Sequence, residues 1–287
     1  MSTLKTRIIL GIVMFGMFFG ILCFDVIFHT DIGFGCLAIL AGAISLYEFY
    51  TIAGKSGFSP FRISGIGIGG WLFVAYWLSL RKNTGIDPSF FRQEVFIILI
   101  FWLFLLQAIT HGTKDAIKNI SVTIFGIFYI FFLLSFAITI RHLHQGICIV
   151  IMVLLISKFG DAGGYLLGRK YGKHKLVKSI SPNKTIEGAC FSLLCSVLIA
   201  VIFNLIPQIK VIDLPWSILF GIVVGCSAIL GDLAESLIKR DVNAKDASNL
   251  VPAFGGILDI VDCLLVSMPV AYYFLVFFKF VSYGPKG

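Results

Sequence analysis

The stretch NISVTIFGIFYIFFLLSFAITI, residues 119–140, contains no charged side chain. A helix that crosses a bilayer needs about 20 consecutive, mainly apolar residues, so this stretch predicts a transmembrane helix. Comparable apolar runs, each bounded by polar residues, cover 8–28, 33–54, 63–80, 94–110, 146–167, 188–206, 215–238 and 257–280. The chain is therefore expected to be an all-α, polytopic integral membrane protein with about nine transmembrane helices.

The overall composition agrees with this expectation. Of the 287 residues, 58% are hydrophobic and 13% are charged, whereas a soluble domain averages roughly 45–50% apolar and about 25% charged residues. The composition excludes an ordinary soluble enzyme, a disordered chain and a disulfide-stabilised mini-protein. Any chemistry must therefore be carried by the helices and by the loops between them.

The net charge of +8 fits the positive-inside rule of membrane proteins better than it fits nucleic-acid binding. If the N-terminus is cytoplasmic, most of the Lys and Arg residues fall on the inner side of the predicted spans. We therefore expect the N-terminus inside, the C-terminus outside and no nucleic-acid partner. The basic excess also allows an anionic substrate.

The two halves of the sequence differ in the chemistry that they carry. Residues 1–145 offer few polar side chains and are expected to form a scaffold of transmembrane helices. Residues 146–287 are expected to form a catalytic transmembrane region with cytoplasmic loops. Polar chemistry starts at 157–175, where Asp161, several glycines and a dense run of bases follow an apolar helix.

The segment SPNKTIEG, residues 181–188, follows this basic run. Ser181 and Pro182 predict a helix start, with Lys184 and Thr185 in its first turn. Backbone N–H groups at a helix start, together with Lys and Thr side chains, suit phosphate oxygens. A loop that is basic only for membrane orientation is the alternative, and it explains the bases but not the Gly, Ser, Thr and Pro residues.

Acidic side chains recur on one helix face in each of the last two predicted spans. Asp232, Glu235, Ser236 and Lys239 are spaced i, i+3, i+4 and i+7, and Asp259 and Asp262 are spaced i, i+3. Carboxylates within a bilayer are costly unless cations or water surround them. Magnesium is the economical partner, because Mg²⁺ prefers carboxylate oxygens, water and substrate phosphates. A structural ion-pair network with Lys239, Arg240 and Lys245 is the alternative.

The stretch SLIKRDVNAKDASNLVPAFGGILDIVD, residues 236–262, resembles the long signature of the phosphatidate cytidylyltransferase family, SxxKRxxxxKDxxxxxPxHGGxxDRxD. The segment GDLAES at 231–236, the Asp161xxxTyr165xxGly168 pattern and SPNKTIEG at 181–188 are also similar to family elements. The resemblance is specific over about 157–265 and only general over the first half.

The resemblance implies that CTP reacts with phosphatidate to give CDP-diacylglycerol and pyrophosphate, with Mg²⁺ required and K⁺ reported in the family's site. It implies that Asp232 and Asp259 are the main metal ligands, with Asp246 and Asp262 as supporting acids. The remaining catalytic residues that it implies are Lys239, Arg240 and Lys245. The residues that it implies in substrate binding are Asp161, Tyr165, Ser181, Lys184, Thr185, Glu187, Ser236, Gly255 and Gly256.

The partners implied are CTP, phosphatidate and the lipid bilayer, with a homodimer as a possible form. The location implied is the bacterial inner membrane, with the active site facing the cytoplasm. Two positions depart from the signature: Phe254 stands where His is expected, and Ile260 stands where Arg is expected. One hydrogen-bond donor and one permanent cation are therefore absent.

Two other classes of function compete with this interpretation. A related CTP-dependent lipid kinase or CDP-lipid synthase would use similar substrates, and the fate of the α- and γ-phosphates of CTP separates a kinase from a cytidylyltransferase. An ion-coupled transporter would also carry acids within the membrane. It predicts acids distributed across the bilayer, whereas here they gather toward one face in the second half.

Overall fold

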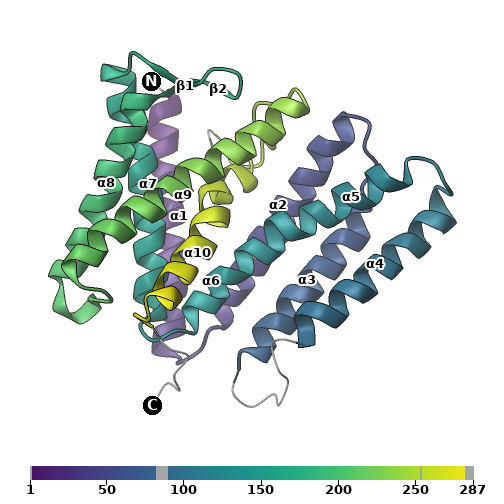
Figure 1. Cartoon of the computed structure of the whole chain (residues 1–287), viewed down its shortest axis with the longest axis horizontal. Coiled ribbons are helices and arrows are strands. Elements are labelled where there is room, and N and C mark those ends of the chain that lie inside the picture. Colours follow the sequence, from purple (N-terminus) through teal and green to yellow (C-terminus); the bar gives the residue numbers. More distant parts are fainter. Residues whose placement is uncertain (1, 82–89, 253, 282–287) are drawn as a thin grey trace. The chain divides into compact units, whose positions relative to one another are not determined.

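The computed structural model describes residues 2–81, 90–252 and 254–281, and most of them are helical (Figure 1). Every predicted apolar run is helical over most of its length, because a helix satisfies its own backbone hydrogen bonds in an apolar medium. The helices are α1 (Ser2–Ile27), α2 (Ile32–Lys55), α3 (Arg62–Ser79), α4 (Phe90–Thr110), α5 (Ala116–Ile127), η1 (Phe128–Phe132), α6 (Leu133–Arg141), α7 (Gly146–Tyr171), α8 (Ile186–Leu205), η2 (Pro207–Ile209), α9 (Leu214–Asp241) and α10 (Leu258–Phe277).

Seven helical segments among the described residues are long and apolar enough to cross a membrane, as expected of a multi-pass membrane protein. α3 and α4 are not among them. α3 contains four glycines, which lower its hydropathy, and the described apolar part of α4 is the shorter stretch Ile97–Thr110. The predicted count of nine spans is thus not confirmed. The seven segments are Ile9–Ile27, Ile32–Lys55, Ala116–Arg141, Gly146–Tyr171, Ile186–Leu205, Leu214–Asp241 and Leu258–Phe277.

The chain forms two compact units. The first unit comprises residues 1–138 and 242–260, and the second comprises 139–241 and 261–287. The loop at 242–257 therefore packs with the N-terminal helices, although it lies next to α9 in the sequence. The predicted division into a scaffold at 1–145 and a catalytic region at 146–287 remains a prediction about function.

In the first unit, α2 packs against α1, α3 and α5. The Tyr50 hydroxyl donates to the carbonyl oxygen of Thr123 at 2.8 Å, and the Thr123 hydroxyl oxygen accepts from the Phe61 N–H at 3.0 Å. The buried carboxylate of Asp25, near the end of α1, caps the start of α2. Its oxygens accept from the N–H groups of Gly33 and Phe34, both at 2.9 Å. Such contacts satisfy donors that a helix start leaves without a partner in the helix.

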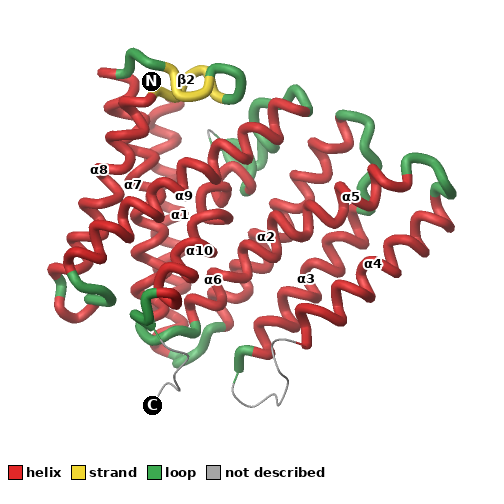
Figure 2. The backbone as a smooth tube through the Cα atoms, in the orientation of Figure 1, coloured by secondary structure: helices red, strands yellow, loops and turns green. Residues whose placement is uncertain are grey.

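In the second unit, α7 and α8 lie side by side, and α9 packs against both. Glycines allow the close approach of α7 and α8: a Cβ added at Gly164 would lie 3.0 Å from the carbonyl oxygen of Gly188. A two-stranded antiparallel hairpin of β1 (Lys175–Val177) and β2 (Ser181–Thr185) connects these helices (Figure 2). The all-α prediction therefore missed one small sheet.

The predicted helix start at Ser181 and Pro182 is wrong, because these residues begin β2 and α8 starts only at Ile186. The N-cap is Thr185, whose side-chain oxygen accepts from the Gly188 N–H at 3.1 Å. A Thr cap satisfies a donor in the first turn and so fixes where the helix begins. Pro182 is tolerated because a two-stranded hairpin consists of edge strands.

Candidate active site

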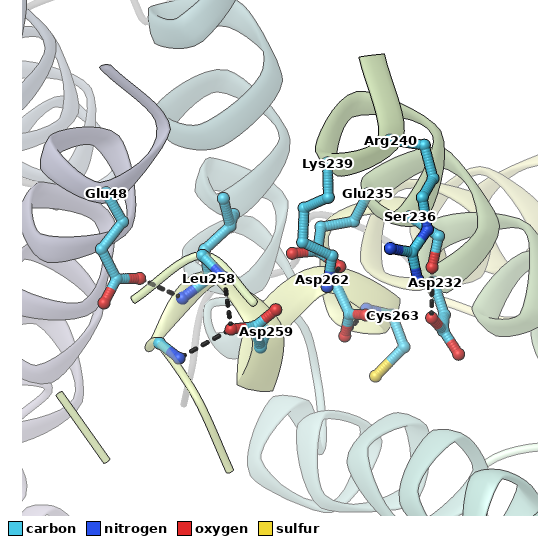
Figure 3. A network of polar contacts seen from close by, with 12 residues as sticks. Glu48, Asp232, Glu235, Ser236, Lys239, Arg240, Leu258, Asp259, Asp262 and Cys263 are labelled. Carbon is cyan, nitrogen blue, oxygen red and sulfur yellow. Dashed lines mark hydrogen bonds and ion pairs between the residues drawn. The ribbon is translucent and has the colours of Figure 1, made fainter. Parts of the chain in front are cut away.

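Three carboxylates of the second unit form a tight group, here called the acid cluster: Asp232, Glu235 and Asp262 (Figure 3). One oxygen from each lies within 4.8 Å of the others. Asp232 and Glu235 share a face of α9 because they are three residues apart, and Asp262 comes from the first half of α10. Glu235 and Asp262 are buried, and Asp232 is partly exposed.

Two lysines pair with the acid cluster. The ammonium group of Lys184, on β2, forms an ion pair with Asp232, and that of Lys239, one turn further along α9, forms one with Glu235. Both lysine side chains are largely buried, being 27% and 11% exposed. Ion pairs that are shielded from water interact more strongly than surface pairs. β2 and the charged end of α9 therefore lie at the same end of the second unit, as the sequence predicts for these two segments.

Helix α7 contributes a further acid and a further base. The ammonium group of Lys158 donates to the Cys263 sulfur at 3.1 Å and lies close enough to Asp161 and Asp262 to interact with both. Asp161 in turn interacts with Lys158, Lys184 and Asp232. These interactions link the acid cluster and Asp161 to the ammonium groups of Lys158, Lys184 and Lys239.

The far end of α9 carries the next residues of the signature. The Ser236 hydroxyl lies 3.4 Å from Asp232 Oδ1, a long hydrogen bond. Arg240 is exposed, and its Nε–H group donates to the carbonyl oxygen of Ile180 at 3.3 Å. This contact ties the end of α9 to the hairpin beside Lys184.

The other predicted substrate-binding residues of the second unit occupy different settings. Thr185 is buried and caps α8, so its side chain has a structural role in this conformation. Glu187 accepts from the backbone N–H groups of Lys173 and His174 and holds the chain that enters the hairpin. Ser181 is partly exposed on β2, and Tyr165 is exposed on α7.

The remaining signature residues belong to the first unit. Asp259 Oδ2 accepts from the N–H groups of Ala247 at 2.9 Å and Gly256 at 2.7 Å, which closes the loop onto the start of α10. Lys245 and Asp246 are exposed on this loop. The structure thus groups the predicted metal ligands Asp232 and Asp262 in the acid cluster, with Glu235. It places Asp246 in the loop at 242–257 and Asp259 in the first turn of α10.

The glycine pair of the signature makes room for carboxylates. Gly255 has φ +102°, a left-handed conformation that favours glycine, and a Cβ there would lie 2.5 Å from Asp259 Oδ2. A Cβ at Gly256 would collide with the carboxylate of Glu48 on α2. Gly255 and Gly256, predicted in substrate binding, therefore have a packing role in this conformation.

The acid cluster could hold a divalent cation. Its three donors are all carboxylate oxygens, which Mg²⁺ prefers over nitrogen or sulfur. Opposite ligands of Mg²⁺ are about 4 Å apart, so oxygens within 4.8 Å of one another need only small shifts to bind the same ion.

Sequence reasoning missed several residues of these clusters. Glu235 shares the predicted polar face of α9, but the predicted ligand set omits it. Lys158 and Cys263 are likewise absent from the predicted catalytic, binding and metal-ligand sets. The i, i+4 spacing of Glu235 and Lys239 could have identified that pair. Glu48 also contacts the loop at 242–257, here called the signature loop, and no sequence pattern near Glu48 indicates this contact.

Comparison with known proteins gives an independent view of the whole chain. Residues 5–278 match the model of the cytidylyltransferase family. The chain is 32% identical to the phosphatidate cytidylyltransferase of Chlamydia pneumoniae over 86% of this chain and 83% of that protein. It is 30% identical to the enzyme of Chlamydia muridarum over 83% and 81%, respectively. It is 29% identical to the enzyme of Bacillus subtilis over 97% of this chain and 100% of that protein.

Proposed function

The chain belongs to the cytidylyltransferase family, and we propose that it transfers CMP from CTP to phosphatidate, giving CDP-diacylglycerol and pyrophosphate. The similarity to phosphatidate cytidylyltransferases extends over most of the chain. The structural observation that carries the proposal is the acid cluster with its paired lysines. Carboxylates that can hold a metal beside ammonium groups suit a reaction between two polyanions.

The bonds that change define what the protein must do. An anionic phosphate oxygen of phosphatidate forms a bond to the α-phosphorus of CTP. The bond from that phosphorus to the bridging oxygen breaks, and pyrophosphate leaves with the electron pair. Because the attacking oxygen is already ionised near neutral pH, no serine nucleophile is required. The task is to align two anions that repel each other and to stabilise the charge of the leaving group.

We assign the metal site of this reaction to the acid cluster. Asp232, Glu235 and Asp262 would hold Mg²⁺ through carboxylate oxygens. When bound, the ion would supply positive charge next to the phosphate oxygens.

The lysines around the cluster would bind phosphate oxygens directly. Lys184 and Lys239 each pair with an acid that we assign to the metal, so each can turn toward phosphate when a cation takes over that acid. Lys158 lies next to Asp161 and Asp262 and would hold their carboxylates in place. Arg240, exposed beside the hairpin, would meet the triphosphate.

The loop of the first unit carries further residues of the signature. Lys245 and Asp246 are exposed and match specified letters of the signature, and Asp259 organises the start of α10. Phe254 and Ile260 replace the expected His and Arg, and we propose that other bases such as Arg169, Lys170 or Lys173 compensate. Arg169 and Lys170 are exposed in the last turn of α7, and Lys173 is exposed just after it.

We also propose how the chain lies in its membrane. α3 and α4 would cross the bilayer with the seven apolar segments, which gives nine spans. The charge bias supports a cytoplasmic N-terminus and an active site at the cytoplasmic face of the bacterial inner membrane. The apolar helices would then present the phosphate of a lipid at the level of the acid cluster. A homodimer is compatible with this arrangement.

The proposal is tested by incubating the purified protein with phosphatidate, CTP and Mg²⁺ in mixed detergent micelles and identifying the lipid products by mass. We expect CDP-diacylglycerol in an amount equal to the pyrophosphate released. The Asp232→Asn variant should make neither. No lipid product from the wild-type protein, under conditions in which the Bacillus subtilis relative is active, would contradict the proposal.

A further inference from the structure

Glu48 is a buried acid of the N-terminal helices that contacts the signature loop. Its side chain lies in the cytoplasmic half of α2, as oriented above, and the residue is 3% exposed. One oxygen accepts from the Ser248 hydroxyl at 2.6 Å and from the Ile257 N–H at 3.1 Å. The other accepts from the Leu258 N–H at 2.8 Å (Figure 3). The partners are 200 to 210 residues further along the chain.

These hydrogen bonds place a negative charge at the start of α10. The first N–H groups of a helix have no partner within the helix, and together they carry a partial positive charge. Glu48 accepts from two of them, at Ile257 and Leu258, while Asp259 accepts from the preceding one, at Gly256. Two carboxylates from different elements of the first unit therefore share the donors that begin α10.

The backbone packs closely around this contact. A Cβ at Gly256 would overlap with the Glu48 carboxylate, so the backbone of residue 256 lies directly against that group. Gly255 is equally close to Asp259 and adopts a left-handed conformation. The loop also closes on itself, since Val251 and Gly255 exchange backbone hydrogen bonds at 2.8 and 2.9 Å. A shift of Glu48 would thus displace the loop at both Ser248 and Ile257.

We propose that Glu48 is a positioning residue for catalysis: it holds the loop at 242–257 and the start of α10 in the conformation that Lys245, Asp246 and Asp259 require for their part in the reaction. The inference rests on the proposed function, because these residues are taken as part of the reaction. Glu48 itself touches neither substrate nor metal in this account. It acts through the three donors that it binds.

A matched control exists in the same unit. Asp25 is also a buried carboxylate, and it also accepts from two backbone N–H groups at the start of a helix, in this case α2. Among the described residues, Asp25 takes no part in the hydrogen bonds that hold the loop at 242–257 and the start of α10. Asp25→Asn therefore reproduces the loss of a buried helix-capping charge and leaves the loop contacts intact.

The experiment compares Glu48→Gln with Asp25→Asn in the full-length protein. Gln keeps the size of Glu but replaces one acceptor oxygen by an amide donor, which faces a backbone N–H or the Ser248 hydroxyl. We expect both variants to lower the melting temperature, but only Glu48→Gln to lower kcat for cytidylyl transfer by tenfold or more. We further expect that only Glu48→Gln speeds amide hydrogen exchange of residues 247–258.

The exchange measurement separates this inference from the proposed function, because it needs no turnover. If the wild-type protein transfers no CMP, the proposed function fails, while the exchange result still tests the positioning role of Glu48. If Glu48→Gln and Asp25→Asn lose activity and exchange protection equally, the inference is wrong. If Glu48→Gln cannot be purified, Ser248→Ala replaces it in the test, since it removes one donor to Glu48. The Ser248 hydroxyl also accepts from the Leu250 N–H, so the readout is exchange at Ile257 and Leu258, whose N–H groups Glu48 binds. Exchange there should become faster, and unchanged exchange at both residues would overturn the inference.

Discussion

Lys184 on β2 forms an ion pair with Asp232 on α9. The pair joins two motifs that the sequence separates, the SPNKTIEG segment and the acidic face before the signature. It also joins two assigned roles, because Lys184 is assigned to phosphate and Asp232 to metal. A carboxylate that neutralises an ammonium group binds a cation less well, so occupation of the metal site should release Lys184 toward the nucleotide.

The first prediction follows from this competition. In Lys184→Ala, Mg²⁺ should stabilise the protein at lower concentrations than in the wild type, because Asp232 no longer pairs with lysine. Turnover should nevertheless fall about tenfold or more, since a charged hydrogen bond to phosphate contributes about 1.5–3 kcal/mol. Thermal shift against Mg²⁺ concentration and initial rates measure the two effects. Lys178→Ala, at an exposed lysine of the hairpin turn, is the control and should change neither.

The second prediction concerns Asp262, one of the two buried acids of the acid cluster. Asp262→Asn should reduce turnover roughly 100-fold or more, because a metal ion contributes several kcal/mol to the transition state. The same variant should lose the Mg²⁺-dependent rise in melting temperature, which for the wild type corresponds to about 2.7 kcal/mol at a metal concentration of 100 Kd. Asp241→Asn, at an exposed acid ending α9, is the control. Full stabilisation of Asp262→Asn by Mg²⁺ would show that the metal binds elsewhere.

The third prediction distinguishes Asp259 from the acid cluster. Its Oδ2 atom accepts from two backbone N–H groups, so Asp259→Asn should destabilise the protein by about 1–3 kcal/mol in addition to abolishing turnover. Denaturant unfolding in detergent measures the first effect. The protein should still insert into the membrane, since the substitution only removes a charge from the segment Leu258–Phe277 and leaves the other six apolar segments unchanged. Normal activity of Asp259→Asn would exclude its assigned role.

The fourth prediction tests the packing of the glycine pair. Gly256→Ala brings a methyl group into the Glu48 carboxylate and should destabilise the protein by about 1–3 kcal/mol. Gly67→Ala is the matched control, because a Cβ at Gly67 on α3 meets no atom within 4 Å. It should be neutral or stabilising by up to about 1 kcal/mol, since Ala favours helix over Gly. Equal effects of the two substitutions would contradict the packing described for residue 256.

The sequence predicts the helices well because the signal is local and strong. A run such as 119–140 must be helical in an apolar medium, whatever its neighbours are. Helical spacing pairs Asp232 with Glu235 and Asp259 with Asp262, and only the resemblance to the family signature puts Asp232 and Asp262 in one predicted metal-ligand set. The hairpin at 175–185 could not be predicted from the sequence, because Ser-Pro followed by polar residues is typical of both a helix start and a turn. Only the contact of Thr185 with Gly188 decides where α8 begins.

Contacts between segments that are far apart in the chain could not be predicted from the sequence for a different reason. Glu48 is a single acid in an apolar run, and its partners lie at 248, 257 and 258. Nothing within a helical turn of Glu48 indicates them. Lys158 is similar: its charge has an adequate explanation in membrane orientation, and its contact with Cys263 emerges only when α7 and α10 are both folded.

The central claim is that CMP, and not a single phosphate, moves from CTP to the lipid. The most direct measurement supplies the purified protein with phosphatidate, Mg²⁺ and CTP labelled either at the α-phosphate or at the γ-phosphate, and follows the label into the lipid extract. We predict that α-label enters the lipid fraction as CDP-diacylglycerol, while γ-label stays in the aqueous phase as pyrophosphate. Entry of γ-label into the lipid would identify a kinase and contradict the account. If the protein is intact and binds metal, the absence of α-label from the lipid extract would also contradict it.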